Sequence, residues 1–443
     1  MNRAKAGPGS REAPAKGSRN GRVILQRPAR LPGAQTVQTR FGKVLGKRFT
    51  RHNLKILAEV HSAYSALRRS ANAIRGRGAN IFTQWIGDPD ALGSAVVLKA
   101  ILAHLGAKEA RILTGSLGHP QNRILVERCG IVLHDPNEGR LPRGLHCMVD
   151  ASPPLGVANT PHVEPVKDYF FVVDHHADPD DVEASCRAGA VRRVKLGFVG
   201  LPVGSTSAFM AALGVAFGIF EALGAQSQAA ATLGIFTDTN DLLHGATPLD
   251  FRMFEKLIRA EASRGLLDDL RDYRVPPEWY AYRAVAFQNA EVRGGVRVGL
   301  VGYLREDHRD VIAEVVNDLL RIEGTSIGIA IGVTERGTDV SVRADSRLLG
   351  GNQQRIVSVI DNLLSYVFPG ASGFKYQRRP PHRVEGGARI PHSQAEDRMW
   401  KLPTGTANGP DAALEHCRKC ARAVIAGLED LKFARPEEIQ GVL

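Results

Sequence analysis

One segment of the chain places a carboxylate and two imidazoles directly after an apolar run. Residues 169–173 read Tyr-Phe-Phe-Val-Val, and Asp174, His175 and His176 follow. The apolar half is typical of a buried parallel strand, and ligands of open α/β sheets bind beyond the carboxyl ends of the strands. A carboxylate and two imidazoles at that position favour a divalent-metal site or a general-base pair. The alternative is a helix-capping Asp followed by surface histidines.

The same arrangement recurs at three other places in the chain. A strand-like run leads into a turn that holds Asp88 and Asp90, and an apolar helix follows. A further run ends at Asp150, and a later apolar stretch ends at Asp238. Each of these residues alone would more often be a cap or a turn residue. Because there are four such segments, we expect their side chains to converge on one rim of a sheet.

These motifs resemble the DHH phosphoesterase superfamily, which is named for its Asp-His-His triplet. The resemblance covers residues 78–395, and the four motifs occur in the family's order. Members include single-strand exonucleases, nanoRNA and pAp phosphatases, cyclic dinucleotide phosphodiesterases and family II pyrophosphatases. The resemblance implies an α/β protein with two domains. One is a parallel-sheet DHH domain with helices on both faces, and the other is a smaller α+β domain similar to DHHA1 domains.

The resemblance also implies a hydrolase that uses two divalent cations, most often manganese, with magnesium as the alternative. A pair of ions about 3.5–4 Å apart polarises a phosphoryl group, activates water and stabilises the leaving oxygen. Asp174 would orient His175 from outside the coordination sphere, and His176 would face the substrate phosphate. The family pattern assigns Gln84, Asp88 and Asp150 to one ion, and Asp90, His175 and Asp238 to the other, with Asp150 bridging both.

The side chain at position 84 departs from the family pattern. The family has a histidine there, whereas this chain has Gln84. A carboxamide oxygen is a poorer ligand for manganese than an imidazole nitrogen. We therefore expect the first ion to bind loosely, to prefer magnesium or to be absent, and a regulatory protein with weakened catalysis becomes an alternative function.

A smaller second domain is expected after the catalytic one. Residues 284–303 alternate around two glycines as a hairpin does, and a later strand ends near Arg343. DHHA1 domains carry a glycine-rich Gly-Gly-His motif, but Pro380-Pro381 stands at the matching place. Proline has no N–H, so arginine side chains would have to bind more of the phosphate. The implied substrate-binding residues are His382 and Arg383, Arg343, and His119 and Asn122 at a helix start. The alternatives are a solvated basic loop at 378–383 and a plain capping turn at 119–122.

Length and composition allow several domains in one chain. A hydrophobic content of 43% in 443 residues is enough for packed cores, and we expect no membrane span because no apolar run reaches the required length. Five cysteines do not form a disulfide framework, which predicts a cytoplasmic protein. The pair Cys417 and Cys420 lacks a second pair for zinc and favours a helix. We divide the chain into a basic, disordered arm (1–50), a DHH catalytic domain (51–245), a helical linker (246–283), a DHHA1-like domain (284–400) and a C-terminal helical segment (401–443).

The first fifty residues account for most of the chain's net positive charge. They contain twelve Lys or Arg and one acid, Glu12, whereas the whole chain has a formal net charge of +12. Such a segment is either a solvated tail or an arm that contacts nucleic-acid phosphates.

The function that these observations favour is metal-dependent hydrolysis of phosphoesters in short oligonucleotides or small nucleotides. NanoRNA, pAp and cyclic dinucleotides remain open as substrates, and the sequence allows an oligomer. Two alternatives stay open: a nucleotide-binding regulatory protein, and an exonuclease-like protein associated with nucleic acid through the basic arm.

Overall fold

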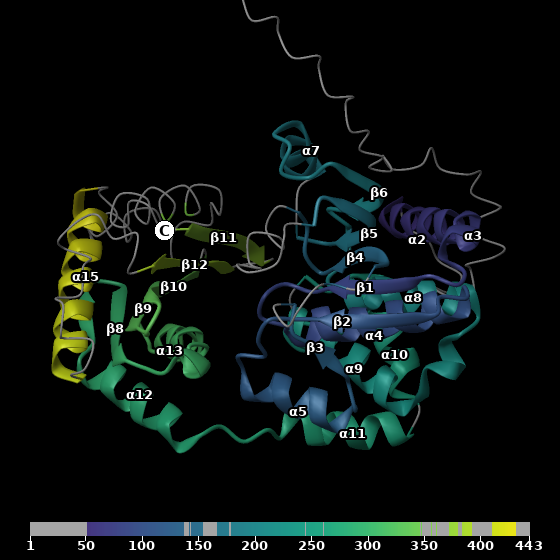
Figure 1. Cartoon of the computed structure of the whole chain (residues 1–443). Coiled ribbons are helices and arrows are strands. Elements are labelled where there is room, and N and C mark those ends of the chain that lie inside the picture. Colours follow the sequence, from purple (N-terminus) through teal and green to yellow (C-terminus); the bar gives the residue numbers. More distant parts are fainter. Residues whose placement is uncertain are drawn as a thin grey trace, which may run out of the picture.

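Two six-stranded sheets, each with its own helices, make up the protein, and a segment along the lower edge of Figure 1 connects them. The computed structural model describes residues 51–136, 141, 143–153, 166–176, 179–243, 245–259, 261–345, 347, 356, 360, 372–379, 383–391 and 410–430. The basic arm therefore lies outside the described residues.

The first sheet is parallel throughout, as the predicted fold class requires. Its strands are β1 (Gly78–Phe82), β2 (Glu109–Leu113), β3 (Leu133–His134), β4 (Leu145–Val149), β5 (Asp168–Asp174) and β6 (Arg193–Val199). Their order is β3-β2-β1-β4-β5-β6, so the chain runs outward from β1 to one edge and then returns to the other side of β1. The connections after β1 and β4 leave in opposite directions, and this switch point is where open α/β sheets bind ligands.

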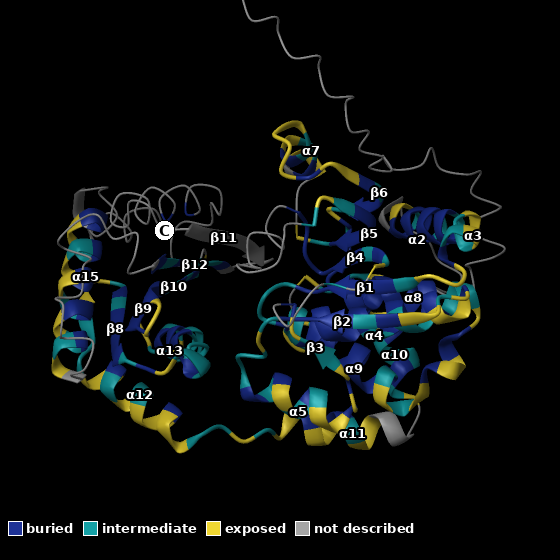
Figure 2. Cartoon of the chain, in the orientation of Figure 1, coloured by how far each residue is buried: buried dark blue, intermediate teal, exposed yellow. Residues whose placement is uncertain are grey.

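Alternating side chains of this sheet enter two different cores. Ile81 and Cys147 belong to the larger core, whereas the next residues, Phe82 and Met148, belong to the smaller one. Both faces are therefore buried, and Figure 2 shows β4 and β5 in dark blue. Near-continuous apolar strands are the expected result.

Helices cover both faces of the first sheet. They are α2 (Arg51–Arg69), α3 (Ala71–Ile74), α4 (Pro89–His104), α5 (Pro120–Arg128), α7 (Pro179–Arg187), α8 (Thr206–Phe217), η1 (Phe220–Leu223), α9 (Gly224–Asp238), α10 (Pro248–Ile258) and α11 (Glu261–Arg271). Helices α4, α8 and α9 contribute to the larger core, and α7 contributes Val182 to the smaller one.

The expected helical linker at 246–283 is divided between the two sheets. Leu249 of α10 and Leu270 of α11 are fully buried in the larger core of the first sheet. Helix α12 (Pro277–Gln288) instead packs on the second sheet, where Trp279 and Ala286 are buried. An amphipathic helix is held by whichever core receives its apolar face, so only residues 272–276 connect the two parts.

The second sheet is mixed and belongs to the smaller α+β domain that the resemblance implies. Its strands are β7 (Glu291–Arg293), β8 (Val296–Tyr303), β9 (Ile327–Val333), β10 (Gly337–Asp345), β11 (Ser372–Arg379) and β12 (Arg383–Pro391). Among the described strands only β8 and β9 pair in parallel. The hairpin predicted at 284–303 is formed by β7 and β8 and is shorter than expected, because the residues up to Gln288 belong to α12. The turn η2 (Glu306–His308) and the helices α13 (Val311–Leu320) and α15 (Pro410–Asp430) complete this part.

Helix α15 explains the cysteine pair near the end of the chain. Cys417 and Cys420 are fully buried in the core of the second sheet, and the five cysteines are all free. His416 on the same helix lies 3.0 Å from the hydroxyl of Thr338. The two cysteines are therefore packing residues of a helix, which is the interpretation that the sequence favours.

Within the described part of the chain, no single helix has the length and apolarity to cross a membrane, whereas α8 together with the segment Phe220–Asp238 passes the same criteria as a pair bent by 119°.

Candidate metal centre

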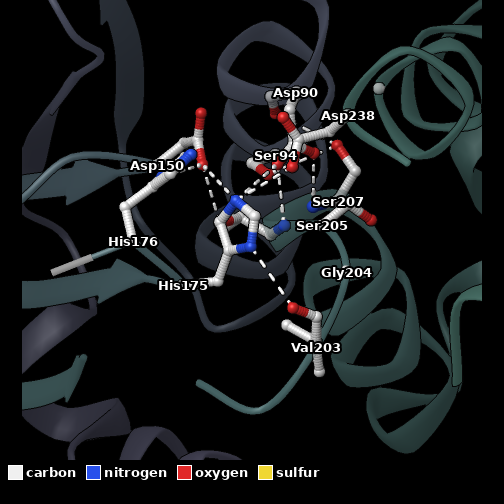
Figure 3. Close-up of polar contacts among 12 residues, drawn as sticks. Asp90, Ser94, Asp150, His175, His176, Val203, Gly204, Ser205, Ser207 and Asp238 are labelled. Carbon is white, nitrogen blue, oxygen red and sulfur yellow. Dashed lines mark hydrogen bonds and ion pairs between the residues drawn. The ribbon is translucent and has the colours of Figure 1, made fainter. Parts of the chain in front are cut away.

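Acidic residues and histidines from four segments meet beyond the carboxyl ends of β1, β4 and β5 (Figure 3). Asp150 follows β4 directly, and Asp174 is the last residue of β5. Asp90 lies in the first turn of α4, and Asp238 is the last residue of α9. Asp238 thus lies at the end of a helix and not after a strand, yet it reaches the same rim of the sheet.

His175 is the centre of this group. Its Nε2 lies 3.0 Å from Asp238 Oδ2, 3.7 Å from Asp150 Oδ1 and 3.9 Å from Asp90 Oδ2. The other ring nitrogen, Nδ1, is 3.3 Å from the carbonyl oxygen of Val203. A hydrogen bond from Nδ1–H to that carbonyl would fix the ring so that Nε2 faces the carboxylates, which is how histidine ligands of metals are usually oriented.

The start of α8 holds two of the carboxylates in place. The backbone amides of Thr206 and Ser207 donate to the two oxygens of Asp90, over 2.7 and 2.8 Å. The hydroxyl of Thr206 donates to Asp150 Oδ1 over 2.9 Å. These amides have no partner within the helix, and the helix dipole favours a negative charge at this end. The first turn of α8 therefore orients the carboxylates without neutralising them.

Asp250 in turn positions the start of α8. It is fully buried and accepts hydrogen bonds from Gly204 N and Ser205 Oγ, each over 2.9 Å. Thr247 donates to it through both its backbone N–H and its hydroxyl. Ser205 caps α8 by accepting from Ala208 N over 3.2 Å. Burial raises the pKa of Asp250, although these four hydrogen bonds counteract it.

Two glycines allow α4 and α9 to approach closely. A Cβ on Gly93 would lie 2.8 Å from the carbonyl oxygen of Ala230, and a Cβ on Gly234 would lie 2.8 Å from that of Pro89. Contacts this short are not tolerated, so larger residues would push the helices apart. The close approach brings Asp238, at the end of α9, next to Asp90, at the start of α4.

The charges of this group are not balanced. Burial, together with neighbouring carboxylates, raises the pKa of Asp88 and of Asp90 to about 6 and raises that of Asp150 well above its usual range. Burial lowers the pKa of His175, but the charge and hydrogen bond of Asp238 outweigh it and raise the pKa to about 10. The group thus favours bound positive charge. Burial also raises the pKa of Asp174, but hydrogen bonds from His176 hold it at about 2.

The donor set fits a hard divalent cation. Asp150 Oδ2 is buried and has no hydrogen-bond partner among the described residues. Two sets of three residues place their ligand atoms within 4.8 Å of one another: Asp90, His175 and Asp238, and Asp150, His175 and His176. Carboxylate oxygens with imidazole suit manganese and similar ions.

Gln84 and Asp174 differ from the expected pattern. The family pattern predicts that Gln84 is a metal ligand, but its side-chain N–H donates to Asp88 Oδ2. It also predicts that Asp174 orients His175, whereas Asp174 Oδ1 instead contacts His176, 3.1 Å from Nδ1 and 2.9 Å from the backbone nitrogen. The tight turn after β5 directs the second imidazole, and not the first, back toward the strand end.

His119 and Asn122 have structural contacts. His119 is the N-cap of α5, where its Nδ1 accepts from Gln121 N over 3.2 Å, and its ring packs edge-on against Tyr273 and Trp279. Burial lowers its pKa to about 4, so the ring is neutral at pH 7. Asn122 donates to the carbonyl oxygens of Gly87 and Leu117, each over 2.9 Å. The capping turn that the sequence left open is thus observed, and Asn122 fixes the turn before Asp88.

Of the expected substrate residues of the second domain, the structure describes the side chain of Arg343 alone. The guanidinium of Arg343 donates to the carbonyl oxygen of Ala313 over 3.2 Å and lies 3.5 Å from Glu385. His382 lies outside the described residues, and Arg383 is described only as the first residue of β12. The role of these three residues in substrate binding stays a prediction.

Thr206, Ser207 and Asp250 were not expected at the site. The run Gly-Ser-Thr-Ser at 204–207 precedes an apolar helix, and such a run is a recognisable helix start. That signal predicts the cap at Ser205. The same signal does not reveal that the amides of Thr206 and Ser207 bind Asp90, because Asp90 lies 116 and 117 positions earlier in the chain.

Known proteins resemble the chain in fold and, weakly, in sequence. No family model matches it. It is 22% identical over 312 residues to an uncharacterized protein of Methanocaldococcus jannaschii, which aligns with 70% of this chain, and the chain spans 57% of that protein's length. An exopolyphosphatase-related protein from Bacteroides fragilis superimposes with a TM-score of 0.57 at 13% identity, over 84% of this chain and 97% of that one. RecJ from Thermus thermophilus in complex with Mn²⁺ gives a TM-score of only 0.38 at 16% identity, over 82% of this chain and 55% of that one. The chain therefore has the fold of the DHH phosphoesterases, as its motifs predict.

Proposed function

We propose that the protein is a divalent-metal-dependent phosphoesterase that acts on short oligonucleotides or small nucleotides. The observation that carries this proposal is the convergence of Asp90, Asp150, His175 and Asp238 at the switch point of a parallel sheet. The shared fold and the motif order support the same class of reaction. The structural neighbour from Bacteroides fragilis is an exopolyphosphatase-related protein, a name that also refers to the hydrolysis of phosphate bonds.

These four side chains would hold the cation. When bound, the ion polarises a phosphoryl oxygen and lowers the pKa of a water molecule. Thr206 N–H and Ser207 N–H keep the oxygens of Asp90 oriented before the ion arrives, so little reorganisation is needed. Manganese suits this mixture of carboxylate and imidazole, and magnesium is the alternative metal.

His176 is the imidazole that would meet the substrate. Its side chain is 24% exposed, against 9% for His175, and its Nδ1 is fixed by Asp174. The low pKa of Asp174 keeps that carboxylate ionised, so it holds the ring with Nδ1–H donating and leaves Nε2 to the substrate phosphate or the leaving oxygen. Asp174 and His176 are therefore the proposed catalytic pair.

The test is a substrate screen with the purified full-length chain. Manganese and magnesium are each supplied with pAp, short RNA, cyclic dinucleotide and pyrophosphate, and the release of phosphate or mononucleotide is measured. We expect turnover on at least one nucleotide, abolished by a chelator. Binding of nucleotide without turnover would favour the regulatory alternative, for which the hydrogen bond from Gln84 to Asp88 is the supporting observation.

The basic arm at residues 1–50 would add affinity for longer nucleic acids. Each phosphate that its Lys and Arg residues neutralise releases a counterion and makes binding more dependent on salt. Deleting residues 1–45 should weaken binding to long RNA or DNA at low salt and flatten the salt dependence. Unchanged affinity would leave the arm as a solvated tail.

A further inference from the structure

We propose that the centre binds one divalent cation tightly, and that the amide N–H of Gln84 occupies the place of a second cation at Asp88. The tight position is formed by Asp90, Asp150, His175 and Asp238. The inference rests on the metal centre of the proposed function, but it concerns the number of ions and not the reaction.

His175 offers a ligand atom for only one ion. Its Nδ1 faces the carbonyl oxygen of Val203, so Nε2 is the nitrogen left for a metal. Both candidate ligand sets within the described residues include His175, and neither includes Asp88. Since Nε2 can bind one ion at a time, only one of the two sets can hold an ion through His175, and neither places an ion at Asp88.

The two oxygens of Asp88 already have donors. Oδ1 accepts from Ala91 N over 2.9 Å, which caps α4, and Oδ2 accepts from the side-chain nitrogen of Gln84. Asp88 is thus held on one side by its own helix and on the other by Gln84. A carboxylate oxygen can accept one hydrogen bond and still bind a cation, as we propose for Asp90, so the group that bars a cation from Oδ2 of Asp88 is the side-chain N–H of Gln84, at the position where the family has a metal ligand.

Gln84 cannot serve as donor and ligand at once. Its amide nitrogen has no lone pair for a metal, and only its oxygen can coordinate. To offer that oxygen in the same direction, the carboxamide would have to rotate and give up its hydrogen bond to Asp88. An imidazole at this position would instead present a nitrogen lone pair to a cation, and imidazole is also the better ligand for manganese.

The turn that contains Gln84 holds this side chain next to Asp88. Thr83 N donates to Leu113 O, at the end of β2, over 3.1 Å, and Gly87 N donates to Ser116 O, in the β2–α5 loop, over 2.8 Å. Asn122 also donates to the carbonyl oxygen of Gly87. The turn from 83 to 88 is therefore anchored at both ends, so Gln84 stays within reach of Asp88.

The experiment counts bound manganese. The full-length chain is equilibrated with Mn²⁺ at concentrations that saturate its tightest position, and elemental analysis gives the number of ions per chain. Electron paramagnetic resonance distinguishes an isolated Mn²⁺ ion from a pair that is magnetically coupled. We expect one ion with an uncoupled spectrum for the natural chain, and two coupled ions for Gln84→His.

The matched control is Gln121→His. Gln121 lies on α5, where its side chain donates to Leu270 O over 3.1 Å, away from the acidic group. This variant adds the same imidazole elsewhere and should bind one ion. Two ions in the natural chain, or one in a folded Gln84→His variant, would overturn the inference while leaving the phosphoesterase proposal standing. No bound manganese at all would overturn both.

Discussion

Two buried groups of charged residues, one in each part of the molecule, are built in opposite ways. In the second sheet, Asp339 is 3% exposed and pairs with Arg309 over 2.8 Å and with Arg389 over 2.9 Å, while Arg389 also contacts Glu306 over 2.8 Å. Two arginines thus face two carboxylates. In the first sheet, several carboxylates surround the ring of His175, and Asp150 keeps one buried oxygen without a partner among the described residues.

The difference separates a structural group from a functional one. In the second group each carboxylate faces an arginine, so the charges are balanced and the network fixes the strands that carry it, although Glu306 Oε2 is also buried without a hydrogen-bond partner among the described residues. An unbalanced group of like charges costs folding free energy unless a ligand supplies the missing charge, and such groups are concentrated at functional sites. We infer that the first group requires a cation, whereas the second requires none.

The largest effect is expected when the unbalanced group loses a ligand. Asp150→Asn keeps the size of the side chain but removes its charge, so metal affinity and turnover should each fall by more than about 100-fold, beyond the loss seen for residues outside the coordination sphere. The metal-free variant should be no less stable than the natural chain, because a buried charge is removed. Metal titration, turnover and thermal unfolding in chelator test this, and unchanged turnover would contradict it. Asp339→Asn is the matched control and should leave metal affinity unchanged.

Breaking the balanced network should affect stability and not metal binding. Asp339→Ala leaves Arg309 and Arg389 without their shared partner, and we expect the free energy of unfolding to fall by about 2 kcal/mol, less than for fully buried pairs because both arginines are partly exposed. Denaturant unfolding measures the loss. A tenfold change in metal affinity would show that the two groups are coupled and would undo the comparison.

A smaller effect is expected at Asp250, which acts through α8. Asp250→Asn replaces one acceptor oxygen with a donor and should disturb the hydrogen bonds to Gly204 and Ser205. The amides that orient Asp90 would then be less well placed, and we expect metal affinity to fall about 10-fold. Calorimetric titration measures it. Full affinity in the variant would mean that α8 does not depend on this carboxylate.

The smallest effect concerns protons. The pKa of His175 is about 10 without metal, so its contribution to stability is complete below about 6.5 and is lost as the pH rises through about 10. A cation needs the neutral ring and ionised carboxylates, so binding at pH 7 should release at least the proton of His175, since the pKa of Asp150 is raised as well. Titration calorimetry in buffers with different ionisation enthalpies counts the protons, and a heat independent of buffer would contradict the assignment.

Much of this centre could be predicted from the chain, because most of its residues come shortly after apolar strands, whereas Asp238 ends the helix α9. The runs before Asp88, Asp150 and Asp174 form β1, β4 and β5, whose carboxyl ends share one rim. Local patterns of this kind determine which residues reach an edge. The parallel sheet was expected from the same patterns, and the smaller α+β domain from the family resemblance.

The directions of side chains, and hydrogen bonds between residues far apart in the sequence, could not be predicted in this way. Whether Asp174 contacts His175 or His176 depends on the turn that follows β5. The support of Asp90 by Thr206 N–H depends on how α4 and α8 pack, and no spacing in the chain records it. His119 likewise has the residue type of a ligand, yet its place between Tyr273 and Trp279 makes it part of the packing.

The most direct test of the account is to locate manganese in crystals of the protein. Anomalous scattering at the manganese edge marks the ion independently of activity. We predict a strong peak within coordination distance of Asp90, Asp150, His175 and Asp238. A peak elsewhere, or no peak at manganese concentrations that support turnover, would contradict the claim that these side chains hold the catalytic metal.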